Sequence, residues 1–324
     1  MGADTAFGRP RLVLIAAALG MLVLLIAPAA IVLLTHGGTR PITPEEGLRV
    51  GRIPTDVAVG GSTVWIVSGR DNRVVSIDAA DLEAGPASHA TGSAPLRLAL
   101  GGGSVWTANA GDDTVTRLDP LLPGSGRRIR VGAQAVDVAV SRDATWVSNG
   151  LRGTVTRIDP ISNRVLGPAV RTGNFPAALA FGAGYLWVVN AGDGTVARVD
   201  PRENLVVGRR LPVGRDPQDV AVAFGSVWVA NRGDGTVTRL SARTGRRQGP
   251  PVRLGGQPGA LAATRAGVLV LDTGAGDVWE IDPHSGHPRL LSRISGFPMA
   301  MAVGAGGAWI VDARDGTVTR LRGR

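Results

Sequence analysis

Apolar and polar residues alternate along most of this chain in one pattern, which returns every 40 or 41 residues. A typical copy holds a short apolar run with Trp, then Asn, a turn rich in Gly and Asp, and a Thr-Val-Thr-Arg run, as in residues 227–240, and the copies that begin at Val64 and Val268 are weaker. The Trp position is filled by Trp65, Trp106, Trp146, Trp187, Trp228, Leu269 and Trp309. Seven copies at one period predict a repeat architecture.

The fifth copy shows how one unit is expected to fold. Short apolar runs at residues 219–222 and 227–231 predict two strands, and the Asp-Gly turn at 233–235 accepts the positive φ of a tight hairpin. Residues 236–240 alternate as a third strand, and residues 251–254 form a looser fourth. Four antiparallel strands per unit, repeated radially, predict blades, so the fold class is an all-β seven-bladed β-propeller.

The two ends of the repeat region are expected to meet. The last unit ends with its third strand at residues 317–321, and residues 48–54 align with the fourth-strand segment 211–217. An amino-terminal outer strand would then complete the seventh blade and cover the edge that an open ring exposes. We expect the propeller to span residues 47–324.

The amino-terminal segment predicts a membrane anchor. Residues 12–34 carry no charge and are long enough, at ~1.5 Å per helical residue, to span a ~30 Å hydrocarbon layer. Arg9 and Arg11 precede this transmembrane helix, which predicts that residues 1–11 stay in the cytoplasm. Residues 35–46 would be a linker, with the propeller outside the cytoplasm. The alternative is a signal peptide cleaved near residues 27–29, which would release a secreted protein.

The amino-acid composition limits the classes of molecule that this protein is expected to bind. The sequence has no Cys, so neither a disulfide nor a Cys-linked lipid anchor is available. The net charge of +9 comes from arginine alone and is compatible with an anionic polymer, lipid or nucleic acid. The expected export of the ring and the absence of a nucleic-acid reader motif argue against nucleic acid.

The residues that recur from unit to unit are interpreted as structural. The periodic Trp are expected to pack one blade against the next. A recurrent Arg is expected to cover apolar surface with its stem while its guanidinium meets a nearby Asp. The Asn before each hairpin is expected to satisfy turn amides. The Arg and Asn positions are filled by Arg117, Arg157, Arg198, Arg239 and Arg320, and by Asn109, Asn149, Asn190 and Asn231.

The phrase at residues 227–231 with 235–237, and its six counterparts, resembles the YVTN and NHL-type (YncE-like) seven-bladed propellers over residues 47–324. It is also similar to the streptogramin B (virginiamycin B) lyase family. That second resemblance implies a His base and a Mg²⁺ ion held by carboxylates near the ring centre. This chain has five Glu and no Glu-x-His pair, so no residue matches those roles.

Candidate binding residues lie where the repeat varies. Two residues beyond the Pro position that opens each first strand, the units read Asp56, Arg97, Asp137, Ala178, Asp219, Ala260 and Ala300. Because a purely structural position would show one residue type, this variation predicts a polar crescent at the channel mouth. The hairpins and Pro-preceding positions expected on the same face add Arg70, Asp71, Arg152, Arg232, Arg314, Phe175 and Phe297. Ordinary variation of solvated loops is the alternative.

Signals of catalysis are weak. Glu280, His284 and His287 are near one another in the sequence, which is compatible with a metal site. The run at residues 282–286 reads instead as a turn after a third strand, on the opposite face of the ring. No catalytic residue, metal ligand or cofactor is assigned from the sequence.

These observations predict a membrane-anchored, extracytoplasmic and non-catalytic binding, sensing or scaffold module. Its partner would be a protein or an anionic cell-envelope polymer such as a glycan. The alternative is an exported lyase of the streptogramin type, which would open an ester-linked cyclic peptide by elimination.

Overall fold

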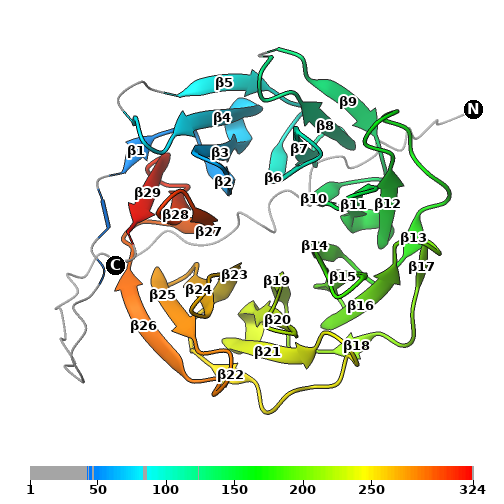
Figure 1. Cartoon of the computed structure of the whole chain (residues 1–324), viewed down its shortest axis with the longest axis vertical. Coiled ribbons are helices and arrows are strands. Elements are labelled where there is room, and N and C mark those ends of the chain that lie inside the picture. Colours follow the sequence, from blue (N-terminus) through cyan, green and yellow to red (C-terminus); the bar gives the residue numbers. More distant parts are fainter. Residues whose placement is uncertain (1–41, 43, 46, 83–85, 123, 323–324) are drawn as a thin grey trace, which may run out of the picture. The chain divides into compact units, whose positions relative to one another are not determined.

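Seven antiparallel sheets surround one axis in the computed structural model, which describes residues 42, 44–45, 47–82, 86–122 and 124–322. The first strand of each sheet lies nearest the axis and the last lies at the rim (Figure 1). The described residues therefore confirm the all-β seven-bladed propeller. The predicted transmembrane helix at residues 12–34, and residues 1–11, lie outside them.

The first four blades are built from strands of two to seven residues. Blade 1 holds β2 (Pro54–Gly60), β3 (Thr63–Ser68), β4 (Arg73–Asp78) and β5 (Ala87–Ala90). Blade 2 holds β6 (Pro95–Gly101), β7 (Ser104–Asn109), β8 (Thr114–Leu118) and β9 (Arg127–Arg130). Blade 3 holds β10 (Ala135–Val140), β11 (Thr145–Asn149), β12 (Thr154–Ile158) and β13 (Val170–Arg171). Blade 4 holds β14 (Pro176–Gly182), β15 (Tyr185–Asn190), β16 (Thr195–Asp200), β17 (Leu205–Val206) and β18 (Leu211–Pro212).

The remaining blades follow the same plan. Blade 5 holds β19 (Pro217–Ala223), β20 (Ser226–Asn231), β21 (Thr236–Ser241) and β22 (Val252–Arg253). Blade 6 holds β23 (Pro258–Ala263), β24 (Val268–Asp272), β25 (Asp277–Ile281) and β26 (Pro288–Arg293). Blade 7 holds β27 (Pro298–Gly304), β28 (Gly307–Asp312), β29 (Thr317–Leu321) and β1 (Leu48–Arg49). Between second and third strands lie the 3₁₀ turns η1 (Gly69–Asp71), η2 (Gly150–Arg152) and η3 (Arg232–Asp234). Within the described part of the chain, no helix is long and apolar enough to cross a membrane.

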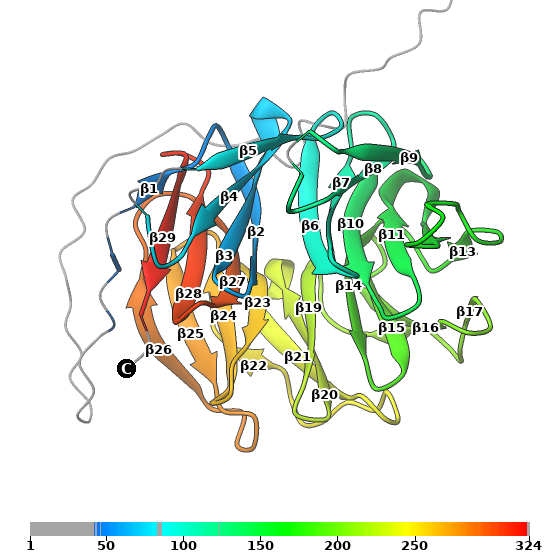
Figure 2. The same ribbon diagram turned by 45° about the horizontal axis from the view of Figure 1, so that its top comes forward.

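Strand β1 closes the ring as expected. It pairs with β29 in antiparallel register, with Leu48 opposite Val318 and Arg49 opposite Thr317, and the two strands lie together in Figure 2. The contact continues through the amide of Val50, which donates to the carbonyl of Gly316 at 2.8 Å. The last sheet is therefore made from both ends of the repeat region.

The core lies between neighbouring blades, and the recurrent Trp form much of it. Five of them are almost fully buried: Trp106, Trp146, Trp187, Trp228 and Trp309. Trp106, for example, packs in one cluster with Val138 and Val147 of the next blade. The predicted packing role of the Trp is thus confirmed.

The recurrent Arg has a different partner from the one expected. In each of five blades its guanidinium lies over an aromatic ring, as for Arg239, whose Cζ is 4.9 Å from the ring centroid of Trp228. Arg320 also donates to the carbonyl of Ala79 at 3.2 Å. None of the five recurrent arginines pairs with a carboxylate among the described residues. The expected Asp partner is wrong, because the opposite residue on the second strand is the Trp itself, which offers a π face.

The recurrent Asn satisfies turn groups as expected. Asn231 donates through Nδ2 to the hydroxyls of Thr236 and Thr238, at 3.1 and 2.9 Å. Its Oδ1 accepts the amide of Gly214 at 3.1 Å. The Asn and the two Thr of the repeat therefore form one buried network that shapes the hairpin.

Candidate functional site at the mouth of the ring

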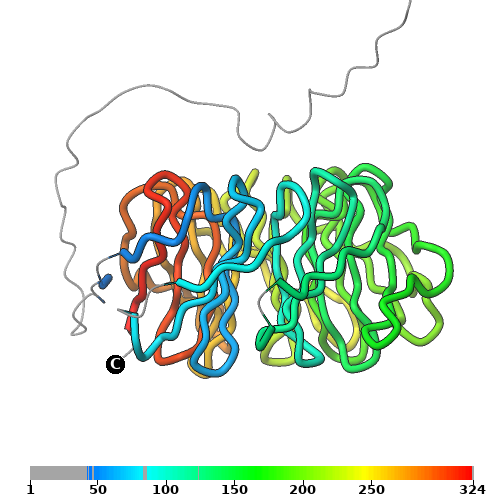
Figure 3. The backbone as a smooth tube through the Cα atoms, turned by 90° about the horizontal axis from the view of Figure 1, so that it is seen from above, coloured from blue at the N-terminus to red at the C-terminus, as the bar shows by residue number. Residues whose placement is uncertain are grey.

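One face of the ring carries nearly all the predicted site residues. First strands begin on this face, and second strands end there, since Pro54 pairs with Ser68 and the amide of Gly69 donates to the carbonyl of Ile53. We call it the mouth face. The opposite, far face carries the turns between first and second strands and between third and fourth strands. Figure 3 shows the blades edge-on, with their turns at the two faces.

The four variable charged residues meet around the axis, and we call Asp56, Arg97, Asp137 and Asp219 the axial cluster. Asp56, Arg97 and Asp219 directly follow a β-bulge in the first strand of their blades, and Asp137 lies within one. Arg97 Nη1 lies 3.8 Å from Asp56 Oδ1, and Asp56 and Asp137 are only 7% and 8% exposed. The structure therefore brings these four side chains together on the mouth face.

Burial dominates the electrostatics of the axial cluster. It raises the pKa of Asp56 to about 6 and that of Asp137 to about 7, although Arg97 opposes both shifts. The pKa of Asp219 is raised for the same reason. Burial alone lowers the pKa of Arg97, but the attraction of the three carboxylates outweighs it and the net shift is upward. Arg97 therefore stays positively charged, whereas burial makes the negative form of the three carboxylates less favourable.

The three carboxylates also join blades in pairs. Asp137 Oδ2 accepts the amide of Leu179 in the next blade at 2.7 Å, while its Oδ1 accepts the amide of Val138 at 2.8 Å. Asp219 repeats this arrangement toward the amides of Leu261 and Val220. Asp56 likewise accepts the amide of Leu98 at 2.8 Å.

The alternation of Asp with other residues therefore has a structural cause. The Asp of blades 1, 3 and 5 also accepts an amide from the following blade. Blades 2, 4 and 6 therefore need no carboxylate at this position and carry Arg97, Ala178 and Ala260. The premise that a structural position shows one residue type is wrong, because one residue serves two strands. Whether the cluster also binds a ligand stays a prediction.

The exposed turns of the mouth face offer arginine and apolar side chains. Arg70, Arg152 and Arg314 are exposed, whereas Arg232 pairs with Asp216 at 2.8 Å. Hydrogen bonding from the amide of Arg52 lowers the pKa of Asp71 to about 2, and Arg52 also pairs with it. The carboxylate of Asp71 is therefore engaged by Arg52 within the ring.

The two predicted aromatic residues differ in exposure. Phe297 is 45% exposed, and Leu151, which no sequence pattern indicates as a site residue, is 56% exposed. Phe175 is only half-buried and lies against Gly150 of the preceding blade. Apolar contact surface on the mouth face therefore comes mainly from Phe297 and Leu151.

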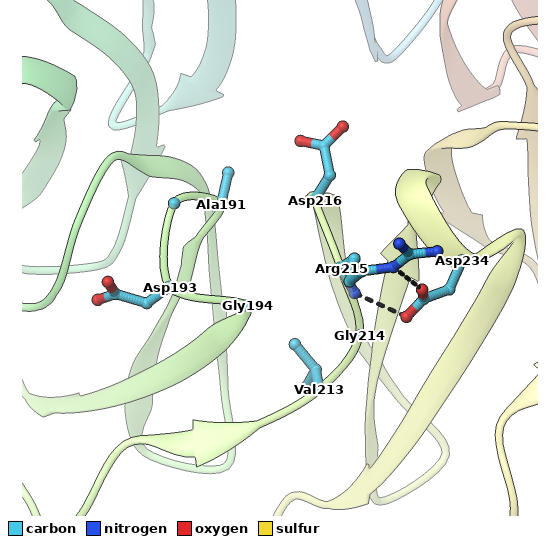
Figure 4. Close-up of a pocket in the computed structure, with 9 residues that line it drawn as sticks. Ala191, Asp193, Gly194, Val213, Gly214, Arg215, Asp216 and Asp234 are labelled. Carbon is cyan, nitrogen blue, oxygen red and sulfur yellow. Dashed lines mark hydrogen bonds and ion pairs between the residues drawn. The ribbon is translucent and has the colours of Figure 1, made fainter.

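A polar cleft of about 540 Å³ opens between blades 4 and 5 on the mouth face. Figure 4 shows Ala191 and Asp193 on one wall and Val213, Arg215 and Asp216 on the other. Its acidic side chains are engaged: Asp193 accepts the amide of Asn174, and Asp234 accepts both the amide and Nε of Arg215. No pattern of residues indicates this cleft, because its two walls are separate turns that only the packing of blades brings together.

The described histidines lie away from the axis. His89 is buried on the rim strand β5, with its ring centroid 5.3 Å from that of Trp65. His284 and His287 lie in the far-face turn between β25 and β26, as the sequence predicts. Glu280 is paired with Arg289 at 2.6 Å. Within the described ranges, no group of three or more acidic, His or Cys residues is arranged to hold a metal ion.

Solved structures share this architecture. A catalytically inactive variant of virginiamycin B lyase from Staphylococcus aureus, solved with quinupristin, is 12% identical over 86% of this chain and 99% of that one, with a TM-score of 0.75. Kuenenia stuttgartiensis hydrazine synthase is 16% identical over 91% and 99%, with a TM-score of 0.75. The WD40 propeller domain of Doa1 is 10% identical over 87% and 96%, with a TM-score of 0.68. No protein-family model and no curated protein sequence matches the chain.

At such identities the likeness shows the fold. The chain is a seven-bladed β-propeller, similar in structure both to a lyase and to a WD40 domain. The activity of a propeller resides in side chains placed on this frame.

Proposed function

We propose that this protein is a membrane-anchored, extracytoplasmic propeller of the YVTN and NHL kind that acts as a non-catalytic binding or sensing module. Residues 12–34 are the proposed anchor, and the mouth face is the proposed contact surface for a protein or an anionic cell-envelope polymer.

The observation that carries this proposal is that the mouth face has two sets of polar and apolar groups, one engaged inside the ring and one exposed to solvent. The polar groups around the axis are committed to hydrogen bonds between blades, as for Asp137 with Leu179. By contrast, Arg70, Arg152, Leu151 and Phe297 are exposed on turns above them. Exposed arginine beside apolar side chains is typical of protein contact surfaces.

Among the residues that the structure describes, no histidine lies where the lyase alternative needs its base. The neighbouring virginiamycin B lyase is described as catalytically inactive when one histidine is replaced by alanine. In the part of this chain that the structure describes, the three histidines lie on the rim strand β5 and in a far-face turn. A general base must come within hydrogen-bond reach of the proton it removes, and these positions are remote from the axis.

The test is capture from intact cells with variants that leave the axial cluster untouched. The charge-reversal pair Arg70→Glu and Arg152→Glu, combined with Phe297→Ser, should reduce the crosslinked partner recovered with the full-length protein by at least about tenfold, as expected when arginine and aromatic anchors are lost. Arg142→Glu and Arg265→Glu, at exposed far-face positions, are the matched controls. Equal recovery from both sets of variants would show that the mouth face is not the contact surface.

A further inference from the structure

A second cleft, of about 460 Å³, lies at the rim between blades 4 and 5, away from the mouth face. Its walls carry four arginines, Arg198, Arg209, Arg246 and Arg247, with Leu211 and Leu240 beside them and no carboxylate. We call it the basic cleft. In Figure 1, β18 lies near the end of β21 at the outer part of the ring.

The local backbone makes room for this cleft. Strand β16 pairs first with β17, through Val199 and Val206, and then with β18, through Val196 and Leu211. The rim strand advances five residues while β16 advances three, so a bulge forms between its two parts. Gly208 supplies the left-handed conformation at the bulge, with φ of 71°. Arg209 follows directly and lines the cleft.

Comparison between neighbouring units shows that other residue types stand at the repeat positions of Arg209 and Arg247. At the repeat position of Arg209, blades 3 and 5 carry Pro168 and Pro250. At the positions of Arg246 and Arg247, blade 4 carries Leu205 and Val206, and blade 3 carries Arg164 and Val165. At those positions, blade 6 carries His287 and Pro288. The ring therefore does not require arginine at these positions.

Two of the four arginines are held in place and two are available. Arg198 lies 4.5 Å from the ring centroid of Tyr185 and donates to the carbonyl of Arg243, and Arg247 donates to the carbonyls of Pro212 and Val213 at 3.3 Å. Within the described ranges, the side chains of Arg209 and Arg246 form no hydrogen bond or ion pair. Four like charges in one cleft repel one another, and a bound anion would remove that repulsion.

We propose that the basic cleft binds a small organic phosphate, in which a phosphoryl group is joined to a sugar- or glycerol-sized body. Guanidinium forks match phosphate oxygens in paired hydrogen bonds, and a doubly charged group can accept from more than one arginine. The apolar side chain of Leu211, which is partly exposed at the cleft, contacts the body of the ligand. A cleft of this volume lies in the range of small-molecule sites and is larger than a bare phosphate needs. This site is independent of the mouth face.

The test is calorimetric titration of the full chain in detergent with glycerol 3-phosphate, inorganic phosphate and uncharged glycerol. Glycerol 3-phosphate should bind and glycerol should not. The double variant Arg209→Pro with Arg246→Leu, which takes the residues of the neighbouring units, should weaken binding by at least roughly tenfold per arginine. A second double variant, Arg209→Gln with Arg246→Gln, removes the charges while keeping long polar side chains. Arg142→Gln on the far face is the control.

A polyphosphate arm distinguishes the source of the phosphate. Tighter binding of polyphosphate than of glycerol 3-phosphate indicates a phosphate-bearing polymer, and the reverse indicates a soluble ester. Either order of affinity supports the site, provided that the double variants abolish the binding of both ligands. No binding of any phosphate at millimolar concentration, or equal binding by the double variants and the control, would overturn the proposal. Neither result bears on capture at the mouth face.

Discussion

At the scale of single residues, the axial cluster shows how one side chain can look functional and still be structural. Asp137 is buried, faces Arg97 and has a raised pKa, all features associated with active sites. Its two oxygens nevertheless accept amides from two different blades. The sequence pattern located this residue correctly but could not show its partners, because Leu179 lies 42 residues away.

The pH dependence of stability follows from these raised pKa values. The ordinary pKa of 3.8 applies to Asp137 in the unfolded chain, whereas in the folded ring it is about 7. Between these values the folded state holds more protons, so the free energy of unfolding falls as the pH rises from about 4 to about 7. Asp56, with a folded pKa of about 6, contributes in the same direction.

Asp137→Ala tests both roles of this residue in one urea-denaturation series. At pH 4 the variant should be less stable than the wild type by about 1–3 kcal/mol, because two buried amides lose their acceptor. At pH 8 the deficit should shrink, since the variant no longer buries a charged carboxylate. Asp143→Ala, at an exposed far-face position, should change neither value. A deficit that stays constant with pH would contradict the assigned pKa shift.

At the scale of elements, the repeat made the positions of the strands predictable, but it did not predict where a strand is broken by a bulge. The period and the Asp-Gly turns located the strands to within a residue or two, as for the third strand of blade 5, predicted at 236–240 and found at Thr236–Ser241. The split of the rim strand of blade 4 into β17 and β18 was not foreseen. Its bulge lies between turn-like residues, and the cleft also needs a turn of the next blade.

Closure by β1 is the element whose removal should affect the whole ring. Deleting residues 47–53 exposes β29 and removes Val50, which is 3% exposed. The melting temperature should fall by roughly 10 °C, since a loss of a few kcal/mol shifts a domain of this size by that order. Arg49→Ala, at an exposed position of the same strand, should leave it unchanged. Calorimetric melting that is the same with and without residues 47–53 would refute the closing role.

At the scale of the whole molecule, this chain shares its fold with other propellers, whereas its surface residues are its own. A virginiamycin B lyase and a WD40 domain align with most of this chain at 10–12% identity. The fold could be predicted because seven copies of one packing unit repeat the same signal. The binding surfaces could not be predicted to the same depth, because each depends on residues that differ between units and meet only across blades.

The most direct measurement of the central claim is site-specific photo-crosslinking in intact cells. A photoreactive residue replaces Arg152 on the mouth face or Arg142 on the far face of the full-length protein, both of them exposed arginines of blade 3. Binding through the mouth face predicts a discrete crosslinked product from position 152 and none from position 142. A product from position 142 alone, or from neither position, would contradict it.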